Sequence, residues 1–290
     1  QDQMYAEMKS SPAAYQNYVN QYSATNAGTT GAAPQLSYED WKKGGNPSGD
    51  MPTDPRLSNN PYIVMSDKNK IANIDSNFTI SSQWEGYGKR DLYVLNTMTG
   101  QKQLIQKGLK SSLVTPSYDG SLVVFYDEIL KQFKSFNTTT LQTKQIAKDI
   151  QFPLYDEDND VPDEPNAYGI AVWMDNHKSF ILYDRYDLWL VDATGLNPSQ
   201  LLTKGRASKK EYRFVKLDDD KKFIGFKDQI LLRVYNEVDK KEGIALLDMS
   251  NKALFTITEQ PMHFTTIVSA KKSNQLIVMQ EDEKNAANIF

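Results

Sequence analysis

Acidic residues are concentrated in one short stretch, residues 156–160 (sequence DEDND), which Asp163 and Glu164 extend. Carboxylates at alternate positions are typical of a Ca²⁺-binding loop. With Asp156 counted as position 1, however, Val161 stands where an EF-hand needs glycine, and Ala167 stands where it needs a bidentate glutamate. The sequence therefore predicts no EF-hand and no cofactor. Three interpretations stay open: an irregular cation site, carboxylates that hold the ammonium group of a substrate, or a solvated acidic loop stiffened by prolines.

A second charged stretch, residues 184–187 (sequence DRYD), joins two apolar runs. Arg185 stands between two carboxylates there. It either forms a structural ion pair at the junction of two strands or faces a central channel and contacts a ligand. The candidate substrate-binding residues of the chain are Asp156, Glu157, Asp158, Asp160 and Arg185.

No catalytic residue can be assigned in this chain. The pattern Gly-x-Ser-x-Gly, which holds a serine nucleophile on a sharp turn, does not occur, and there is no cysteine. The two histidines, His177 in an expected hairpin turn and His263 before an expected strand, have no evident nucleophile or orienting acid beside them. Both histidines are expected to be structural.

The elements that must position these residues follow from an internal repeat. Four apolar segments each end in Asn or Asp followed by turn residues, and their last residues lie 41, 55 and 56 positions apart, at Asn96, Asn137, Asp192 and Asp248. Intervals of this size are close to the length of a propeller blade. Polar turns also precede apolar runs that begin at Leu122, Phe180, Phe223 and Leu276, and they predict hairpins.

Each repeat thus predicts a blade of four antiparallel strands, because a blade buries its two faces only by stacking on its neighbours. We predict an all-β fold, a β-propeller of about four and a half blades over residues 61–290. The fifth blade has strands at 264–269 and 276–279 and the start of a third strand at 288–290. The ring is then incomplete, and we expect the chain to be a piece of a longer protein.

Residues 1–60 form a different region. Ser11-Pro12 predicts a helix start, and Tyr15, Tyr18 and Tyr22 continue at helical spacing, so a short helix to about residue 22 and an irregular linker are expected. The formal net charge of -4 argues against a nucleic-acid interface. No apolar run approaches the roughly 20 residues that span a bilayer, so no membrane span is expected.

Three stretches of the sequence resemble a known family. They are residues 152–162 (FPLYDEDNDVP), 168–173 (YGIAVW), and 183–189 (YDRYDLW) followed by Leu201-Leu202-Thr203. They are similar to the N-terminal propeller of prolyl-oligopeptidase-family (S9) serine peptidases, especially large members from Bacteroidota. Residues 62–100 resemble the preceding blade of the same proteins. The resemblance covers about residues 41–290 and is most specific in the middle.

The resemblance implies a bacterial, periplasmic or secreted protein. In this family the propeller limits the access of peptides to a C-terminal α/β-hydrolase domain that carries the catalytic serine, aspartate and histidine. None of those three positions occurs here, so the implied partners are a peptide substrate and that hydrolase domain. The dipeptidyl-peptidase branch holds the substrate amino terminus with two propeller glutamates, a motif that Asp156-Glu157 matches only superficially. The alternative is a non-catalytic propeller that binds other proteins in an envelope complex, with a partner chain completing its last blade.

Overall fold

A computed structural model describes the backbone of residues 62–64 and 69–75 and, in full, residues 89–96, 99–111, 113–218, 220–270 and 275–289. The chain divides into two units, Gln1–Asn60 and Pro61–Phe290. The helix expected near residues 10–22 lies outside the described residues. The described elements belong to the second unit, in which the only helical segment described is the short 3-10 helix η2 (Arg206–Ser208).

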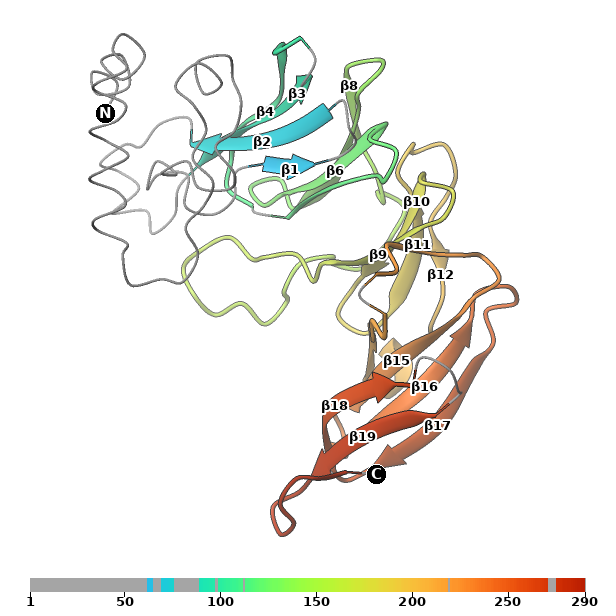
Figure 1. The fold of residues 1–290 in the computed structure, drawn as a ribbon. Helices are drawn as coiled ribbons and strands as arrows, with labels where there is room; N and C mark the ends of the chain where they lie inside the picture. Colours follow the sequence, from blue (N-terminus) through green and yellow to red (C-terminus); the bar gives the residue numbers. More distant parts are fainter. Residues whose placement is uncertain are drawn as a thin grey trace, which may run out of the picture. The chain divides into compact units, whose positions relative to one another are not determined.

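The described part of this unit is built from β-sheets that follow one another along the chain (Figure 1). The first sheet contains β1 (Tyr62–Val64), β2 (Asn69–Asp75), β3 (Arg90–Asn96) and β4 (Lys102–Leu109). The second contains β5 (Val114–Pro116), β6 (Leu122–Asp127), β7 (Gln132–Asn137) and β8 (Gln142–Gln145). Each sheet pairs consecutive strands antiparallel, which is the meander that the repeat predicts.

Three more sheets follow. The third contains β9 (Ile170–Met174), β10 (Ser179–Tyr183), β11 (Leu188–Asp192) and β12 (Gln200–Leu201), with β14 (Phe223–Ile224) added at its edge. The fourth contains β13 (Lys210–Phe214), β15 (Gln229–Asn236), β16 (Glu242–Asp248) and β17 (Leu254–Gln260). The fifth contains β18 (His263–Ser269), β19 (Leu276–Glu281) and β20 (Asn288–Ile289). The all-β prediction is confirmed, and the described residues form no closed ring.

One strand assignment is wrong. The apolar run that begins at Phe223 was expected to be the second strand of its repeat, but Phe223 and Ile224 pair in parallel with Trp173 and Met174 of β9. The second strand of the fourth sheet is β15 instead. The third sheet therefore has five strands, where four were expected. A loop of the fourth sheet supplies the extra strand and ties the two sheets together through backbone hydrogen bonds.

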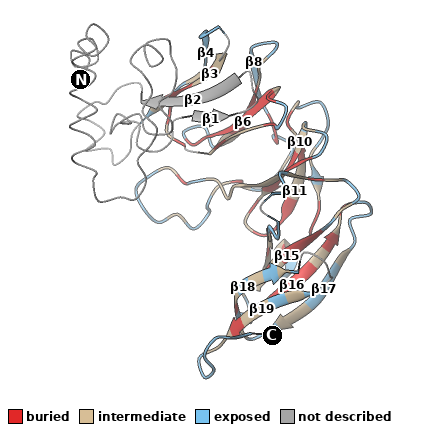
Figure 2. Cartoon of the chain, viewed as in Figure 1, coloured by how far each residue is buried: buried red, intermediate tan, exposed pale blue. Residues whose placement is uncertain are grey.

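Sheets pack on one another because alternate residues of a strand point to opposite faces. All six residues of β6 are buried (Figure 2). Leu122, Val124 and Tyr126 pack against the third sheet, while Val123 and Phe125 pack against the first. The same alternation recurs in the third and fourth sheets, where Leu182 and Ile181 of β10, and Leu232 and Leu231 of β15, belong to different hydrophobic clusters. An interior sheet thus stabilises both of its neighbours.

Candidate functional site

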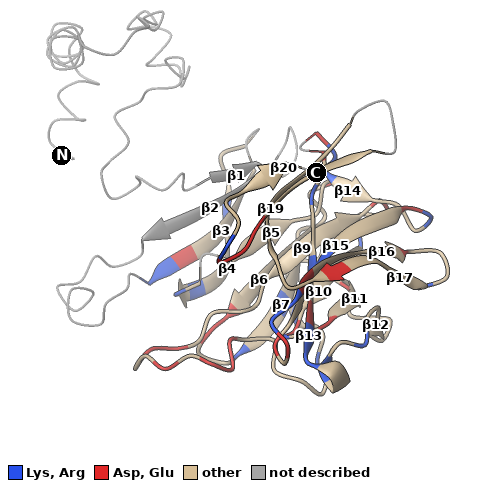
Figure 3. Cartoon of the chain, turned by 90° about the horizontal axis from the view of Figure 1, so that it is seen from below, with Lys and Arg blue, Asp and Glu red and all other residues tan. Residues whose placement is uncertain are grey.

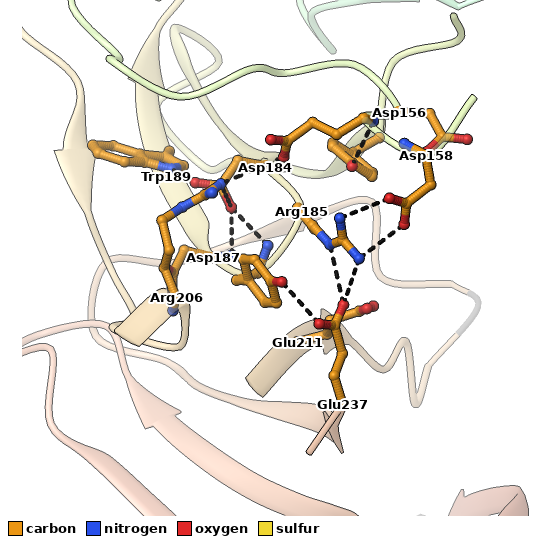
Figure 4. Close-up of polar contacts among 12 residues, drawn as sticks. Asp156, Asp158, Asp184, Arg185, Asp187, Trp189, Arg206, Glu211 and Glu237 are labelled. Carbon is orange, nitrogen blue, oxygen red and sulfur yellow. Dashed lines mark hydrogen bonds and ion pairs between the residues drawn. The ribbon is translucent and has the colours of Figure 1, made fainter. Parts of the chain in front are cut away.

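The hairpin turn between β10 and β11 is held by a buried aspartate. Asp184 is fully buried, and its Oδ1 accepts hydrogen bonds from the backbone N–H groups of Tyr186 (2.7 Å) and Asp187 (2.8 Å). Its Oδ2 accepts one from Trp189 Nε1 (2.9 Å). A carboxylate that satisfies the turn in this way fixes the turn's shape. Asp184 is therefore committed to the turn and to Trp189, and the side chain of Arg185 points to other partners (Figure 4).

Asp187 connects the turn to the segment that leads into the fourth sheet. Its Oδ1 accepts hydrogen bonds from Thr203 Oγ1 (2.7 Å) and from the N–H of Gly205 (2.5 Å). Gly205 is required here, because a Cβ atom would lie 1.9 Å from the carbonyl oxygen of Lys210. The close backbone approach brings Arg206, the next residue, beside the turn.

Arg185 bridges two segments that are distant in sequence. Its Nε (3.1 Å) and Nη2 (2.8 Å) donate to Glu237 Oε1, and its Nη1 donates to Asp158 Oδ1 (2.9 Å). Tyr186 Oη donates to the other oxygen of Glu237 (2.9 Å). Glu237 follows β15, in the position of its hairpin that corresponds to Arg185. The turn of one sheet is thereby joined to the turn of the next and to the acidic segment.

The surroundings of Arg185 and Glu237 favour the charged forms of both side chains. Burial alone would raise the pKa of Glu237, but the hydrogen bonds from Tyr186 and Arg185 outweigh it and lower that pKa. Burial opposes the charge on Arg185, yet its hydrogen bonds to Glu237 raise its pKa. Glu211 of β13 behaves oppositely, because burial raises its pKa and the nearby charge of Glu237 adds to the effect, against the attraction of Arg213. The carboxylate of Glu237 is therefore firmly ionised, whereas that of Glu211 gains a proton more readily.

A second guanidinium group, that of Arg206, lies between two aromatic rings. Its Cζ is 4.1 Å from the ring centre of Phe152 and 5.1 Å from that of Tyr186. Its Nη2 is 3.4 Å from Asp184 Oδ1 and 3.8 Å from Glu157 Oε2. Its Nε and Nη2 are buried and make no hydrogen bond with good geometry, so packing on the rings holds this cation.

We call residues Glu157, Asp158, Asp184, Arg185, Tyr186, Asp187, Arg206, Glu211, Arg213 and Glu237 the charged cluster. Basic and acidic residues both occur in the loops and strands beside β10 and β13 (Figure 3). Six carboxylates of this cluster face three guanidinium groups. Such a surplus of buried and half-buried negative charge favours a cationic ligand over an anionic one.

Of the candidate residues, the structure brings Glu157, Asp158 and Arg185 into the charged cluster. Asp156 lies at the loop base, where its Oδ1 accepts a hydrogen bond from the N–H of Asp158. Asp160 is exposed, with no polar side-chain partner among the described residues. Their role in substrate binding stays a prediction. The described residues contain no cluster of His, Cys, Asp and Glu that could hold a metal ion.

Sequence reasoning missed Glu237, Glu211 and Arg206. Aligning the two hairpin turns would have matched the residues 183–185 (YDR) with 235–237 (YNE), which places Glu237 opposite Arg185. His263, expected to be structural, has its Nδ1 2.6 Å from Glu242 Oε1 at the start of β18. No described helix is long and apolar enough to cross a membrane.

Comparisons with known proteins found similarity only among solved structures. No family model and no curated protein sequence matches the chain. A Porphyromonas gingivalis dipeptidyl peptidase 4 matches with a TM-score of 0.46 and 12% identity, over 79% of this chain and 37% of that one. A prolyl endopeptidase matches with a TM-score of 0.45 and 12% identity, over 79% and 34%. TolB of Acinetobacter baumannii matches with a TM-score of 0.37 and 15% identity, over 77% and 51%.

The chain thus spans about a third of the length of these two peptidases and about half that of TolB. The matches include the kinds of peptidase that the sequence resemblance names.

Proposed function

We propose that this chain is the propeller portion of a prolyl-oligopeptidase-like serine peptidase and that it gates the access of peptides to a C-terminal α/β-hydrolase domain of a longer protein. In this proposal the chain supplies binding and selection, and the hydrolase domain supplies the nucleophile. A periplasmic or secreted bacterial location is part of the same proposal.

One observation carries the proposal: the stretches that resemble the family meet in space. Asp158 of the first stretch binds Arg185 of the third. Asp187 of the third binds Thr203, which ends the resemblance. Within the third stretch, Asp184 binds Trp189. Residues that only filled a core would be scattered over several sheets. The residues of these stretches instead form one polar cluster around the turn between β10 and β11. Such a cluster is expected of a binding surface positioned by a rigid scaffold.

The charge of the cluster indicates what it selects. Asp158 has a side chain that is 68% exposed and is fixed by Arg185, so it presents a positioned carboxylate to solvent. Glu157 and Asp160 lie beside it on the same loop; Asp160 is exposed, and the side chain of Glu157 is 28% exposed. A peptide carries a positive charge at its free amino terminus, which such carboxylates attract. We therefore propose that Asp156, Glu157, Asp158 and Asp160 orient an incoming peptide by its amino group.

The first test uses the chain alone. We expect it to leave proline-containing chromogenic peptides intact and to remain unlabelled by a serine-reactive fluorophosphonate probe. Labelling of any serine in this chain would overturn the assignment of catalysis to another domain. A folded sample, shown by a cooperative urea transition, is the necessary control.

A second candidate function is that of a non-catalytic propeller that binds a partner protein. The fifth sheet favours it, because one face of this sheet exposes Val268, Ile277 and Ile289 at 46%, 48% and 65%. Interior sheets of this chain bury both faces, so an uncovered apolar face calls for a neighbour. Either a further sheet of the same protein or a partner chain would cover this face. The mass of the native protein separates the two functions, because only the peptidase proposal predicts a protein much larger than this chain.

A further inference from the structure

Glu128 is a buried acid with unmet hydrogen-bonding capacity. It lies in the turn between β6 and β7, is 4% exposed, and its Oε2 is buried without a hydrogen-bond partner. Together with Lys110, which follows β4, it lines a cavity of about 210 Å³. A buried carboxylate is unfavourable unless a cation or a donor compensates it. Lys110 is the cation close enough to interact with it.

Lys110, however, is engaged elsewhere. Its ammonium group contacts Asp163, and the lysine side chain is only 7% exposed while that of Asp163 is 43% exposed. Asp163 belongs to the segment that we call the acidic loop, residues 156–166, which is closed at its base by a hydrogen bond from Asp156 N–H to the carbonyl of Asn166 (2.8 Å). The contact between Lys110 and Asp163 therefore fastens this loop to the end of the first sheet.

The other contacts that residues 164 and 165 of the acidic loop make with the second sheet are weaker. Lys131 Nζ is 3.8 Å from Glu164, and both side chains are about 40% exposed. Tyr126 Oη donates a long hydrogen bond (3.4 Å) to the carbonyl of Pro165. The other charged groups near Glu128 are Asp127, which pairs with Lys134 (2.7 Å), Glu164 of the loop, and Lys107, which lines the same cavity.

We propose that Glu128 and Asp163 compete for the ammonium group of Lys110, so that protonation of Glu128 fixes the Asp163 side of the acidic loop and its deprotonation releases that side. When Glu128 is neutral, it does not compete with Asp163 for Lys110, and the loop is held. When Glu128 is charged, its buried carboxylate attracts Lys110 strongly, because the dielectric there is low. The exposed Asp163 can be solvated by water, so it loses little on release.

The proton affinity of Glu128 fits such a switch. Burial raises its pKa to about 7, against the attraction of Lys110, and the charges of Asp163, Asp127 and Glu164 raise it further. The change of charge then falls near neutral pH. This inference does not rest on the proposed function, because it concerns only the order of a loop in this chain.

A spin label on the acidic loop tests it. The chain has no cysteine, so Asp160→Cys creates a unique attachment site at an exposed position. We expect the nitroxide line shape to become more mobile between about pH 5.5 and about pH 8.5, with a midpoint near pH 7. Glu128→Gln in the same background is expected to keep the label immobile over the whole range. Lys110→Met is expected to make it mobile over the whole range.

Lys131→Met is the matched control, since it removes another lysine contact of the loop without changing the competition. It is expected to retain the midpoint. The inference is overturned if Glu128→Gln retains the transition of the parent, or if the parent line shape does not change with pH. If Glu128→Gln fails to fold, Asp163→Asn replaces it. That variant is expected to be mobile at every pH, and a retained transition would be equally contradictory.

Discussion

Arg185 and Glu237 are joined by two hydrogen bonds, of 3.1 and 2.8 Å, from the turn of the third sheet to the turn of the fourth. Glu237 has a side chain that is 17% exposed, and Tyr186 is its other hydrogen-bond donor. The pair therefore links two neighbouring sheets and at the same time holds the acidic segment through Asp158.

Arg185→Met should lower the free energy of unfolding by about 3 kcal/mol, because it leaves the largely covered Glu237 carboxylate with Tyr186 as its one side-chain donor. Urea unfolding measures the difference. Lys241→Met is the control, because Lys241 and Asp239 form an ion pair with both side chains about 40% exposed. Lys241→Met should lower the free energy of unfolding by no more than about 0.5 kcal/mol. Equal losses in the two variants would show that Arg185 is an ordinary surface residue.

Gly205→Ala should destabilise the chain by about 3 kcal/mol or more, because the new Cβ would meet the backbone oxygen of Lys210 at 1.9 Å and force the chain apart. Gly225→Ala is the matched control. Its Cβ would lie 3.3 Å from the side-chain oxygens of Asp175 and Asp228, which can move. Thermal unfolding of both variants gives the comparison. A loss as small as that of the control would contradict the close backbone approach beside Asp187.

Glu128→Gln should change how stability depends on pH. In the folded chain the pKa of Glu128 is about 7, against an ordinary value of 4.5, because the carboxyl group is buried. Between these values the folded state keeps a proton that the unfolded state has released, so stability falls as pH rises. The variant lacks this loss, so at about pH 8 its free energy of unfolding should be higher than that of the parent by up to about 3 kcal/mol.

Near pH 4 the variant and the parent should be equally stable in the same urea titrations. Glu283→Gln, at an exposed acid between β19 and β20, is the control and should keep the parent's slope. A Glu128→Gln variant with an unchanged slope would mean that this carboxyl group is not the titrating group.

Glu157→Gln combined with Asp160→Asn should weaken binding of a C-terminally labelled Ala-Pro peptide several-fold, since each removes a negative charge of the acidic loop that attracts the amino terminus. Fluorescence anisotropy measures it. The double variant should leave binding of the N-acetylated peptide unchanged, and Asp220→Asn, an exposed acid on a different loop, should affect neither peptide. Equal binding of free and acetylated peptide by the parent would remove the acidic loop from the proposed peptide site.

The repeat predicted most of the sheets because their third strands share a local signal, an apolar run that ends in Asn or Asp. β3, β7, β11 and β16 end at the expected residues. The fourth repeat failed because Phe223 follows an acidic turn just as Leu122 and Phe180 do, and a short apolar run does not reveal its pairing partner. In the structure, the longer apolar run of β15 forms the second strand of the fourth sheet, the place where the run at Phe223 was expected.

The charged cluster was predicted in part for a similar reason. Arg185 and the acidic segment stand out as unusual local composition, so their residues could be selected. Glu237 lies 52 residues from Arg185, in an ordinary turn, and only the stacking of two sheets brings them together. Asp184 and Asp187 looked like partners of Arg185 because of their positions beside it. In the structure, Asp184 accepts hydrogen bonds from N–H groups of the turn, and Asp187 accepts them from Thr203 and from the N–H of Gly205.

The central claim is that this chain belongs to a longer serine peptidase, and the native protein tests it directly. An antibody raised against these 290 residues would isolate the protein from its source. Its intact mass and its reaction with a fluorophosphonate probe would then be measured together. We predict a mass several tens of kilodaltons above that of this chain and one labelled serine outside it. A native protein of the mass of this chain that takes up no label would contradict the claim.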